Sequence, residues 1–256
     1  MQFNDWFERN IRTVFILPAI LFVVVMVAFP LGYTFVISLR DWNLTTYAPV
    51  RWIGLGNYLT LFADARFWSA MGRTLAFSFG AVAVETILGV AIALFMNGEM
   101  RGKNLSKTLF LLPMVATPVA VGMVWLLIYE PTIGLANHVL KLAGVAAQPW
   151  LTSRRTVLGS LMLIDVWQWT PIIMLISLAG LAILPRDPYD SARIDGANRL
   201  QILTKITLPL VMPTVLVGIL IRLIDALKTY DIIYSTTQGG PGEASETLNI
   251  LGYVLG

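Results

Sequence analysis

Residues 188–209 read PYDSARIDGANRLQILTKITLP, a polar stretch that lies between two long apolar segments. The segment before it, about 156–184, contains one charged residue, Asp165. The segment after it, about 206–234, carries charges only in its second half. Crossing the roughly 30 Å of bilayer hydrocarbon takes about 20 apolar residues in helical form. We therefore interpret the flanking segments as membrane-spanning helices and the stretch between them as a loop too polar to span.

This polar loop is predicted to form two short helical pieces around Gly196. Pro188 is well placed to open the first piece, since proline suits the first turn of a helix. Gly196 lets the chain change direction, because glycine reaches positive φ without steric cost. Leu200 and Leu203 then follow at helical spacing before Pro209. A short exposed helix between two spans is a surface on which a soluble partner can push.

Further apolar segments extend the same pattern toward both ends of the chain. They run over Val14–Leu39, Thr74–Asn97 and Thr108–Tyr129, and another begins near Thr247. The ten residues from Thr247 cannot span a bilayer, so either the last helix continues beyond Gly256 or it ends in another way. The predicted fold is an all-α integral membrane protein of about six transmembrane helices, the last incomplete here, in a single domain over residues 1–256.

Composition agrees with a membrane protein and excludes several other classes. The chain is 57% hydrophobic and 13% charged, whereas soluble domains carry roughly 25% charged residues. The net charge of +3 is small and does not suggest nucleic-acid binding. With no cysteine and one histidine, His138, a thiolate or histidine metal site is not expected. No G-x-x-x-x-G-K-[ST] phosphate loop is present, so we expect no cofactor here and ATP hydrolysis, if any, on another chain.

Lysine and arginine residues near the span ends indicate the orientation. With the N-terminus inside, nine of them fall on the cytoplasmic side and seven on the other. The short connection 101–107 is strongly basic, and the loop after Tyr234 has no positive residue. We predict a multi-pass protein of the bacterial cytoplasmic membrane, surrounded by lipid, with its N-terminus and the 188–209 loop inside.

The 188–209 loop resembles the EAA loop of bacterial binding-protein-dependent ABC importer permeases. That pattern is E-A-A, three residues, Gly, nine residues, Ile, one residue, Leu-Pro. Asp190-Ser191-Ala192 stands for E-A-A, Gly196 follows after three residues, and Ile206 follows after nine more. Leu208-Pro209 closes the pattern in register. Asp for Glu and Ser for Ala depart from the consensus, but the acidic charge is kept.

This resemblance implies that residues 186–209 are a coupling helix that docks on a separate nucleotide-binding ATPase. Asp190 would meet a basic residue of the ATPase, Ala192 and Ala197 would allow close approach, and Gly196 would set the turn. The implied coupling residues are Asp190, Ser191, Ala192, Asp195, Gly196 and Ala197. A basic helix lying on lipid is the alternative, and the two aspartates argue against it.

A second stretch of sequence indicates which group of importer permeases the chain resembles. Residues 239–248, GGPGEASETL, are similar to the G-G-P-x-x-x-(S/T)-x-T-L segment of carbohydrate-type permeases, and Leu17-Pro18 and residues 52–58 fit that group too. The likeness is greatest to the half typified by the maltose permease larger subunit and the glycerol-3-phosphate permease first subunit. It implies a type I ABC importer transmembrane domain for a sugar, oligosaccharide, polyol or glycerol phosphate. The implied partners are a second homologous permease subunit, two ATPase subunits carrying ATP and Mg, and an extracytoplasmic solute-binding protein.

Polar groups inside the spans suggest where a substrate would pass, because they are costly there. One helix face in the 156–184 segment and another in the 206–234 segment combine hydrogen-bonding groups with an aromatic ring, which together suit a sugar. The predicted path is formed by Asp165, Gln168, Trp169, Arg222, Asp225, Thr229 and Tyr230.

Several alternatives stay open. Arg222 and Asp225, three residues apart, could simply neutralise each other, and Glu85 is expected to be a structural partner of another helix. An ion- or proton-coupled secondary transporter would use Asp165, Arg222 and Asp225 as its relay. An ABC permease for a non-sugar solute would share the EAA spacing. A membrane enzyme is disfavoured, because the chain has no clustered catalytic set.

Overall fold

The structure, a computed structural model, describes residues 2–42, 49–98 and 102–255. Arg101 of the predicted basic connection lies outside these ranges. The chain divides into two units, one ending at Ala65 and the other beginning at Arg66. The single domain over 1–256 stays a prediction.

The first unit is dominated by one long apolar helix, α1 (Gln2–Ser38). Its stretch Phe15–Ser38 is long and apolar enough to cross a membrane, and none of its most apolar window is buried. Pro18 and Pro30 lie inside the helix, as membrane helices tolerate. This helix confirms the first predicted span.

A small hairpin follows α1. Strand β1 (Arg40–Asp41) pairs antiparallel with β2 (Arg51–Trp52), and helix α2 (Gly56–Ala63) comes next. The Asn57 side-chain amide donates to two carbonyls, one at the end of α1 and one in β1, at 2.9 Å each. These bonds fix the start of α2 against the end of α1.

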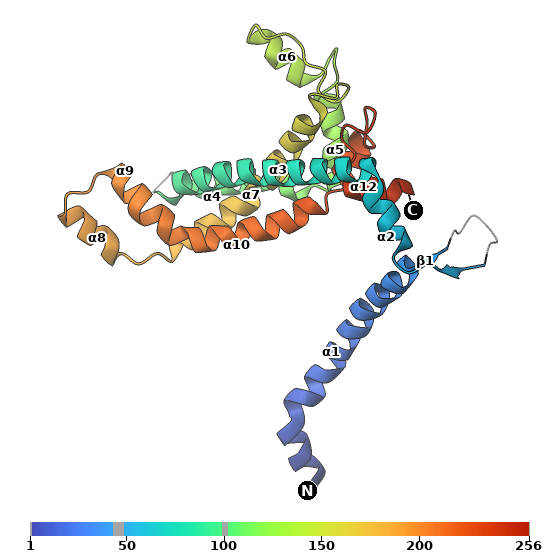
Figure 1. The fold of residues 1–256 in the computed structure, drawn as a ribbon. Helices are drawn as coiled ribbons and strands as arrows, with labels where there is room; N and C mark the ends of the chain where they lie inside the picture. Colours follow the sequence, from blue (N-terminus) through green and yellow to red (C-terminus); the bar gives the residue numbers. More distant parts are fainter. Residues whose placement is uncertain (1, 43–48, 99–101, 256) are drawn as a thin grey trace. The chain divides into compact units, whose positions relative to one another are not determined.

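The second unit is a helical bundle. Its elements are α3 (Ala65–Asn97), α4 (Lys103–Val115), α5 (Pro118–Ile128), α6 (Leu135–Leu142), α7 (Val157–Ala182), α8 (Asp187–Ile194), α9 (Arg199–Ile202), the π-helix η1 (Leu203–Thr207), α10 (Leu208–Leu227), α11 (Asp231–Thr236) and α12 (Leu248–Leu255). Helices α3, α4, α7 and α10 run alongside one another, with α8 and α9 at one end and α11 and α12 at the opposite end (Figure 1). We name these the loop end and the far end.

The described residues hold four helices that are long and apolar enough to span a membrane, or five if a bent pair counts as one. Three are α1, α3 and α7, the fourth is the Arg199–Leu227 stretch, and the bent pair is α4 with α5. The prediction of an all-α membrane fold is therefore confirmed.

Two of the predicted spans are wrong in detail. The third was expected to be one helix, but α4 and α5 meet at an angle of 96°. Ala116 and Thr117 are both extended there. For Thr117 the reason is Pro118, since the residue before a proline is disfavoured in the helical region. The fifth was expected to reach Tyr234, but α10 ends at Leu227 and α11 is a separate short helix.

Helix α7 is the centre of the bundle, because α3 and α10 both approach it closely through glycines. A Cβ on Gly89 would lie 2.8 Å from Ile173, and a Cβ on Gly180 would lie 2.9 Å from Val211. Small residues let membrane helices approach closely where no hydrophobic force drives their association. The backbones of these three helices are therefore held in close contact.

A single added methyl group tests this packing. Gly180→Ala is expected to lower the free energy of unfolding by about 1–3 kcal/mol, because the new Cβ overlaps α10. Gly159→Ala on the same helix is the control, since nothing lies within 4 Å of a Cβ there; alanine's helix propensity predicts no loss at that site. Thermal unfolding in mild detergent measures both, and equal behaviour of the two variants would contradict the close approach.

Candidate functional site

A buried ion cluster joins the three central helices. Arg222 of α10 donates from Nε to Glu85 Oε2 at 2.8 Å and from Nη2 to Glu85 Oε1 at 2.9 Å. The same Nη2 lies 2.8 Å from Asp165 Oδ2 on α7. All three residues are at most 2% exposed. The Arg222 guanidinium also lies 5.2 Å from the ring centre of Trp169.

This cluster is costly to bury, and its geometry offsets the cost. Charges in a low-dielectric interior are tolerated only when they are paired and hydrogen-bonded. The guanidinium fork meets Glu85 with two parallel bonds, the strongest arrangement of this kind. Two carboxylates against one guanidinium still leave a formal excess of one negative charge, and Asp165 Oδ1 has no hydrogen-bond partner. We infer that the cluster clamps α3, α7 and α10 together.

Gln168 supports the bend between α4 and α5. Its side-chain amide donates to the carbonyl of Ala116 at 3.1 Å, at the break between the two helices. A broken membrane helix leaves backbone groups that must be satisfied by neighbours. Gln168 therefore has a structural task in the bundle and is fully buried.

The predicted path residues do not form one continuous face. Asp165, Gln168 and Arg222 lie in the protein interior, whereas Asp225 is exposed. The partly exposed members are Trp169, Thr229 and Tyr230. The accessible part of the predicted path is therefore smaller than the sequence suggested.

The alternative that Arg222 and Asp225 neutralise each other does not hold in the structure. Arg222 is occupied by Glu85 and Asp165, whereas Asp225 Oδ1 lies 3.8 Å from the Lys228 ammonium at an exposed position. Two carboxylates in the core need a cation, while a carboxylate at the surface is solvated by water. The expected role of Glu85 as a structural partner of another helix is confirmed.

The loop end carries the two-helix arrangement predicted for residues 188–209. Pro188 lies in the first turn of α8, and Gly196 has φ +73°. Asp190 and Arg193 form an exposed pair at 3.3 Å, with side chains 63% and 70% exposed. The six predicted coupling residues, Asp190, Ser191, Ala192, Asp195, Gly196 and Ala197, are all exposed or partly exposed.

A capping box begins the second short helix, and sequence reasoning missed it. The Asn198 side chain accepts from the Gln201 backbone at 2.9 Å, and the Gln201 side chain accepts from the Asn198 backbone at 2.8 Å. The pattern of a capping residue followed three positions later by Gln was available as a signal. The helix then passes through the π-helix η1 into α10.

A hollow of about 460 Å³ adjoins the first short helix. Its lining includes Arg186, Tyr189, Asp190, Arg193 and Thr207. The Tyr189 hydroxyl lies 3.2 Å from the Thr207 hydroxyl, which links α8 to η1. The loop end therefore presents a polar, exposed surface with both charge signs.

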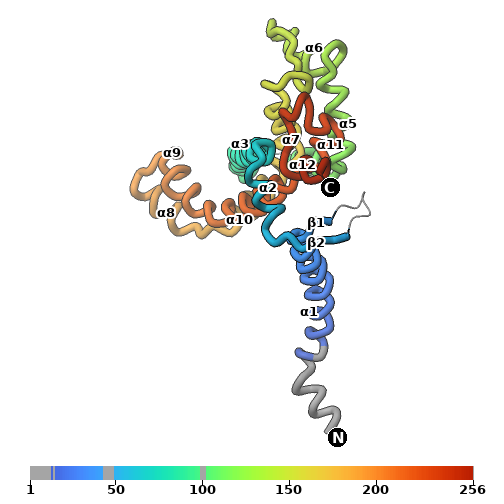
Figure 2. Tube along the Cα trace, turned by 45° about the vertical axis from the view of Figure 1, so that its right-hand side comes forward, coloured from blue at the N-terminus to red at the C-terminus, as the bar shows by residue number. Residues whose placement is uncertain are grey.

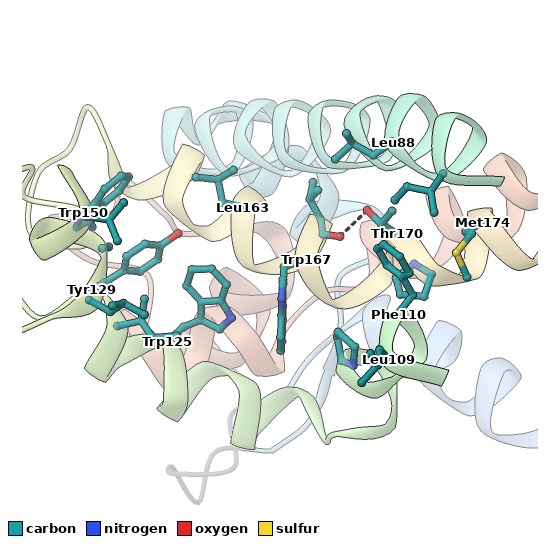
Figure 3. A pocket seen from close by; sticks show the side chains of 18 of the residues that line it. Leu88, Leu109, Phe110, Trp125, Tyr129, Trp150, Leu163, Trp167, Thr170 and Met174 are labelled. Atoms are coloured by element: carbon teal, nitrogen blue, oxygen red, sulfur yellow. Dashed lines mark hydrogen bonds between the residues drawn. The ribbon is translucent and has the colours of Figure 1, made fainter. Parts of the chain in front are cut away.

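A larger, apolar groove of about 720 Å³ lies among α3, α4, α5, α6 and α7. Figure 3 shows Trp125 and Trp167 side by side in it, and Tyr129 near Trp150 at one end. The ring centres of Trp125 and Trp167 are 5.8 Å apart. The Thr170 hydroxyl of the groove donates to a carbonyl of its own helix at 2.6 Å. Because so few polar groups face this groove, sugar hydroxyls would lose their hydrogen bonds there. The bend between α4 and α5 helps to shape it, so the straight-span prediction missed it.

At the far end, Glu246 ties the 239–248 stretch to the start of α3. Arg66 donates to its carboxylate from Nε at 2.9 Å and from Nη2 at 2.6 Å. Arg73 donates to the Glu246 carbonyl at 2.7 Å, and the Leu248 amide donates to the Thr74 hydroxyl at 2.9 Å. Arg66 and Arg73, seven residues apart, share one face of α3. Sequence reasoning counted these arginines only as loop charges and missed the cluster.

Comparison with known proteins places the chain among membrane transport components. A family model described as "Binding-protein-dependent transport system inner membrane component" matches residues 85–254. The trehalose/maltose transport system permease protein MalF of Thermococcus litoralis is 37% identical over 248 residues, covering 96% of this chain and 83% of that protein. The trehalose transport system permease protein SugA of Mycobacterium tuberculosis is 35% identical over 246 residues, covering 96% of this chain and 78% of that protein.

A solved structure has the same fold. It is the crystal structure of a bacterial alginate ABC transporter in complex with an alginate pentasaccharide-bound periplasmic protein. One of its chains matches with a TM-score of 0.81 at 23% identity, covering 98% of this chain and 85% of that chain.

Proposed function

Because the chain belongs to the family of binding-protein-dependent transport system inner membrane components, we propose that it is the permease subunit of an ABC importer for carbohydrates. The exposed two-helix loop at residues 186–209, held between two spans, is the observation that carries this proposal. The relatives named for trehalose and maltose transport support a sugar as cargo. The chain itself is not the enzyme, and ATP and Mg are bound by a partner ATPase.

The proposed assembly places this permease beside a second, homologous permease in the cytoplasmic membrane. Two nucleotide-binding ATPase subunits lie on the inside, where one of them contacts the loop end of this permease, and the N-terminus is on the same side. A solute-binding protein delivers the sugar to the far end, in keeping with the periplasmic protein bound to the alginate transporter. Sugar then passes along the accessible predicted residues, Trp169, Asp225, Thr229 and Tyr230.

The mechanism follows from how the loop joins the bundle. When the ATPases close on ATP, they pull on the loop through Asp190 and the surfaces beside Gly196. The loop continues directly into α7 and α10, the two helices that Arg222 clamps to α3. Movement of the loop is therefore passed to a rigid block of three helices, which rocks between inward-facing and outward-facing states.

The proposal is tested by capturing the tagged permease from mild detergent and measuring which proteins accompany it. Wild type is expected to bring down a nucleotide-binding ATPase and a second permease. Asp190→Arg reverses the charge offered to the ATPase. Gly196→Pro cannot adopt φ +73° and loses the amide that donates to the Arg193 carbonyl at 3.2 Å. Both variants are expected to lose most of the ATPase and to keep the second permease.

Lys141→Glu, in the last turn of α6 and away from the loop end, is the control for a charge reversal elsewhere on the chain, and it should retain the ATPase. If wild type captures no ATPase, or if both loop variants hold it normally, the importer proposal fails. Uptake driven by a proton or sodium gradient would then identify a secondary transporter.

A further inference from the structure

Three tyrosine rings meet at the far end, just beyond the end of α10. Tyr230 and Tyr234 stack with ring centres 5.1 Å apart and 16° between their planes. Tyr253 of α12 stands nearly edge-on to Tyr234, with ring centres 5.1 Å apart. The hydroxyls of Tyr234 and Tyr253 are 3.3 Å apart. We name these three residues the tyrosine cluster.

The backbone beneath the cluster is held in place by α12. The Asn249 side-chain amide donates to the carbonyls of Leu227 at 3.1 Å and Thr229 at 3.4 Å. These carbonyls belong to the break after α10, where the chain has left the helical pattern and needs other donors. Figure 2 shows α11 and α12 close together near the end of the chain, so α12 carries Tyr253 to the two rings at the break.

The cluster is accessible rather than packed away. Tyr234 is 37% exposed and Tyr253 is 58% exposed, and Tyr230 is partly exposed. Ring faces and phenol hydroxyls are therefore both available to a ligand. A pyranose has the matching chemistry, because its C–H face stacks on aromatic rings and its hydroxyls both donate and accept hydrogen bonds.

Charge around the cluster favours an uncharged ligand. Asp225 on the last turns of α10 is exposed and pairs loosely with Lys228 at 3.8 Å, and Asp231 directly follows Tyr230 and is exposed as well. These three side chains carry a formal charge of −1. A phosphate or carboxylate brought to this surface would meet net repulsion, whereas a carboxylate can accept hydrogen bonds from a neutral sugar.

We propose that the tyrosine cluster, with Thr229 and Asp225, is the site where the permease receives an uncharged pyranoside at the far end of the path. This inference rests on the proposed function, and it narrows the cargo to neutral sugars. Tyrosines at a membrane boundary often act as interfacial anchors. Here the rings contact one another and two hydroxyls meet, an arrangement that builds a shared surface rather than three separate anchors.

The test uses the permease purified with its partner subunits, reconstituted in liposomes with the solute-binding protein. The readout is ATP-dependent uptake of labelled trehalose, maltose and glycerol 3-phosphate, normalised to the amount of assembled complex. Tyr230→Leu and Tyr253→Leu remove a ring and are expected to lower disaccharide uptake at limiting sugar about tenfold, equivalent to about 1.4 kcal/mol. Tyr234→Phe keeps the ring and loses only the hydroxyl, so a loss of about threefold is expected.

Tyr33→Leu is the matched control, because Tyr33 is 52% exposed and stacks on Phe29 but belongs to α1. It should take up sugar like wild type. Wild-type uptake of disaccharide with unchanged Tyr230→Leu and Tyr253→Leu variants would overturn the tyrosine site and leave the importer standing. Preferred uptake of glycerol 3-phosphate by wild type would overturn the neutral-sugar assignment. Absence of ATP-dependent uptake for all three probes would overturn the proposed function itself.

Discussion

Arg222→Leu is expected to lower the free energy of unfolding by about 3–5 kcal/mol, because it leaves two buried carboxylates without their cation. Glu85 and Asp165 are at most 1% exposed in their side chains and cannot reach water without opening the bundle. Thermal unfolding of the purified protein in mild detergent measures the change. The loss is expected to be larger than that for any exposed ion pair in the described part of the chain.

Two further variants test whether the stability loss in Arg222→Leu comes from the unpaired buried carboxylates or from lost side-chain packing. A triple variant with Arg222→Leu, Glu85→Gln and Asp165→Asn removes all three charges and is expected to recover part of the lost stability, since a buried neutral amide costs less than a buried unpaired carboxylate. Lys228→Leu, on an exposed pair with Asp225, should change stability by less than about 1 kcal/mol. A triple variant as unstable as the single one would contradict the account of unpaired charge.

Glu246→Ala is expected to lower the free energy of unfolding by roughly 2–3 kcal/mol, since it removes charge-assisted hydrogen bonds. The effect is smaller than at Arg222 because the Arg66 side chain is 33% exposed and can be solvated again. Residues 239–248 would also lose the part of their tie to α3 that the Glu246 carboxylate makes, while the bonds at the Glu246 carbonyl and the Leu248 amide remain. Hydrogen exchange of these residues, measured beside thermal unfolding, should rise in the variant.

Glu243→Ala in the same stretch is the control. Its side chain is 51% exposed and lies 3.3 Å from Arg66, so less than about 1 kcal/mol is expected. Equal losses from the two glutamates would show that burial of Glu246 does not matter. Unchanged exchange at residues 239–248 would show that the bonds at the Glu246 carbonyl and the Leu248 amide order this stretch without the Glu246 carboxylate.

The sequence was informative wherever the deciding signal is local. Hydropathy over about 20 residues identified α1, α3, α7 and most of α10, because the cost of a polar group in lipid is set residue by residue. The two short helices of the 188–209 loop could also be predicted from the sequence, since Pro188 and Gly196 act through their own backbone angles. Pro118 alone could not predict the bend between α4 and α5, because Pro18, Pro30 and Pro113 stand inside continuous helices.

The ion cluster could not be predicted in this way. Arg222 has Asp225 as its near neighbour in sequence, yet its partners lie 57 and 137 residues away. A charge on a helix pairs with whatever the adjoining helix presents, and that depends on which faces meet. Glu246 and Arg66 are likewise 180 residues apart.

By itself the sequence determined that this protein is a helical membrane protein with a polar loop of two short helices between two spans. Only the tertiary structure decided which polar residues are buried as a clamp and which remain accessible. It also decided that Tyr253 of α12 meets Tyr234 of α11 and Tyr230, the residue before α11, in one surface. The physical reason is the distance along the chain over which each interaction acts. Hydropathy, turn chemistry and caps act within a few residues, whereas pairing in the core depends on helices brought together through Gly89 and Gly180.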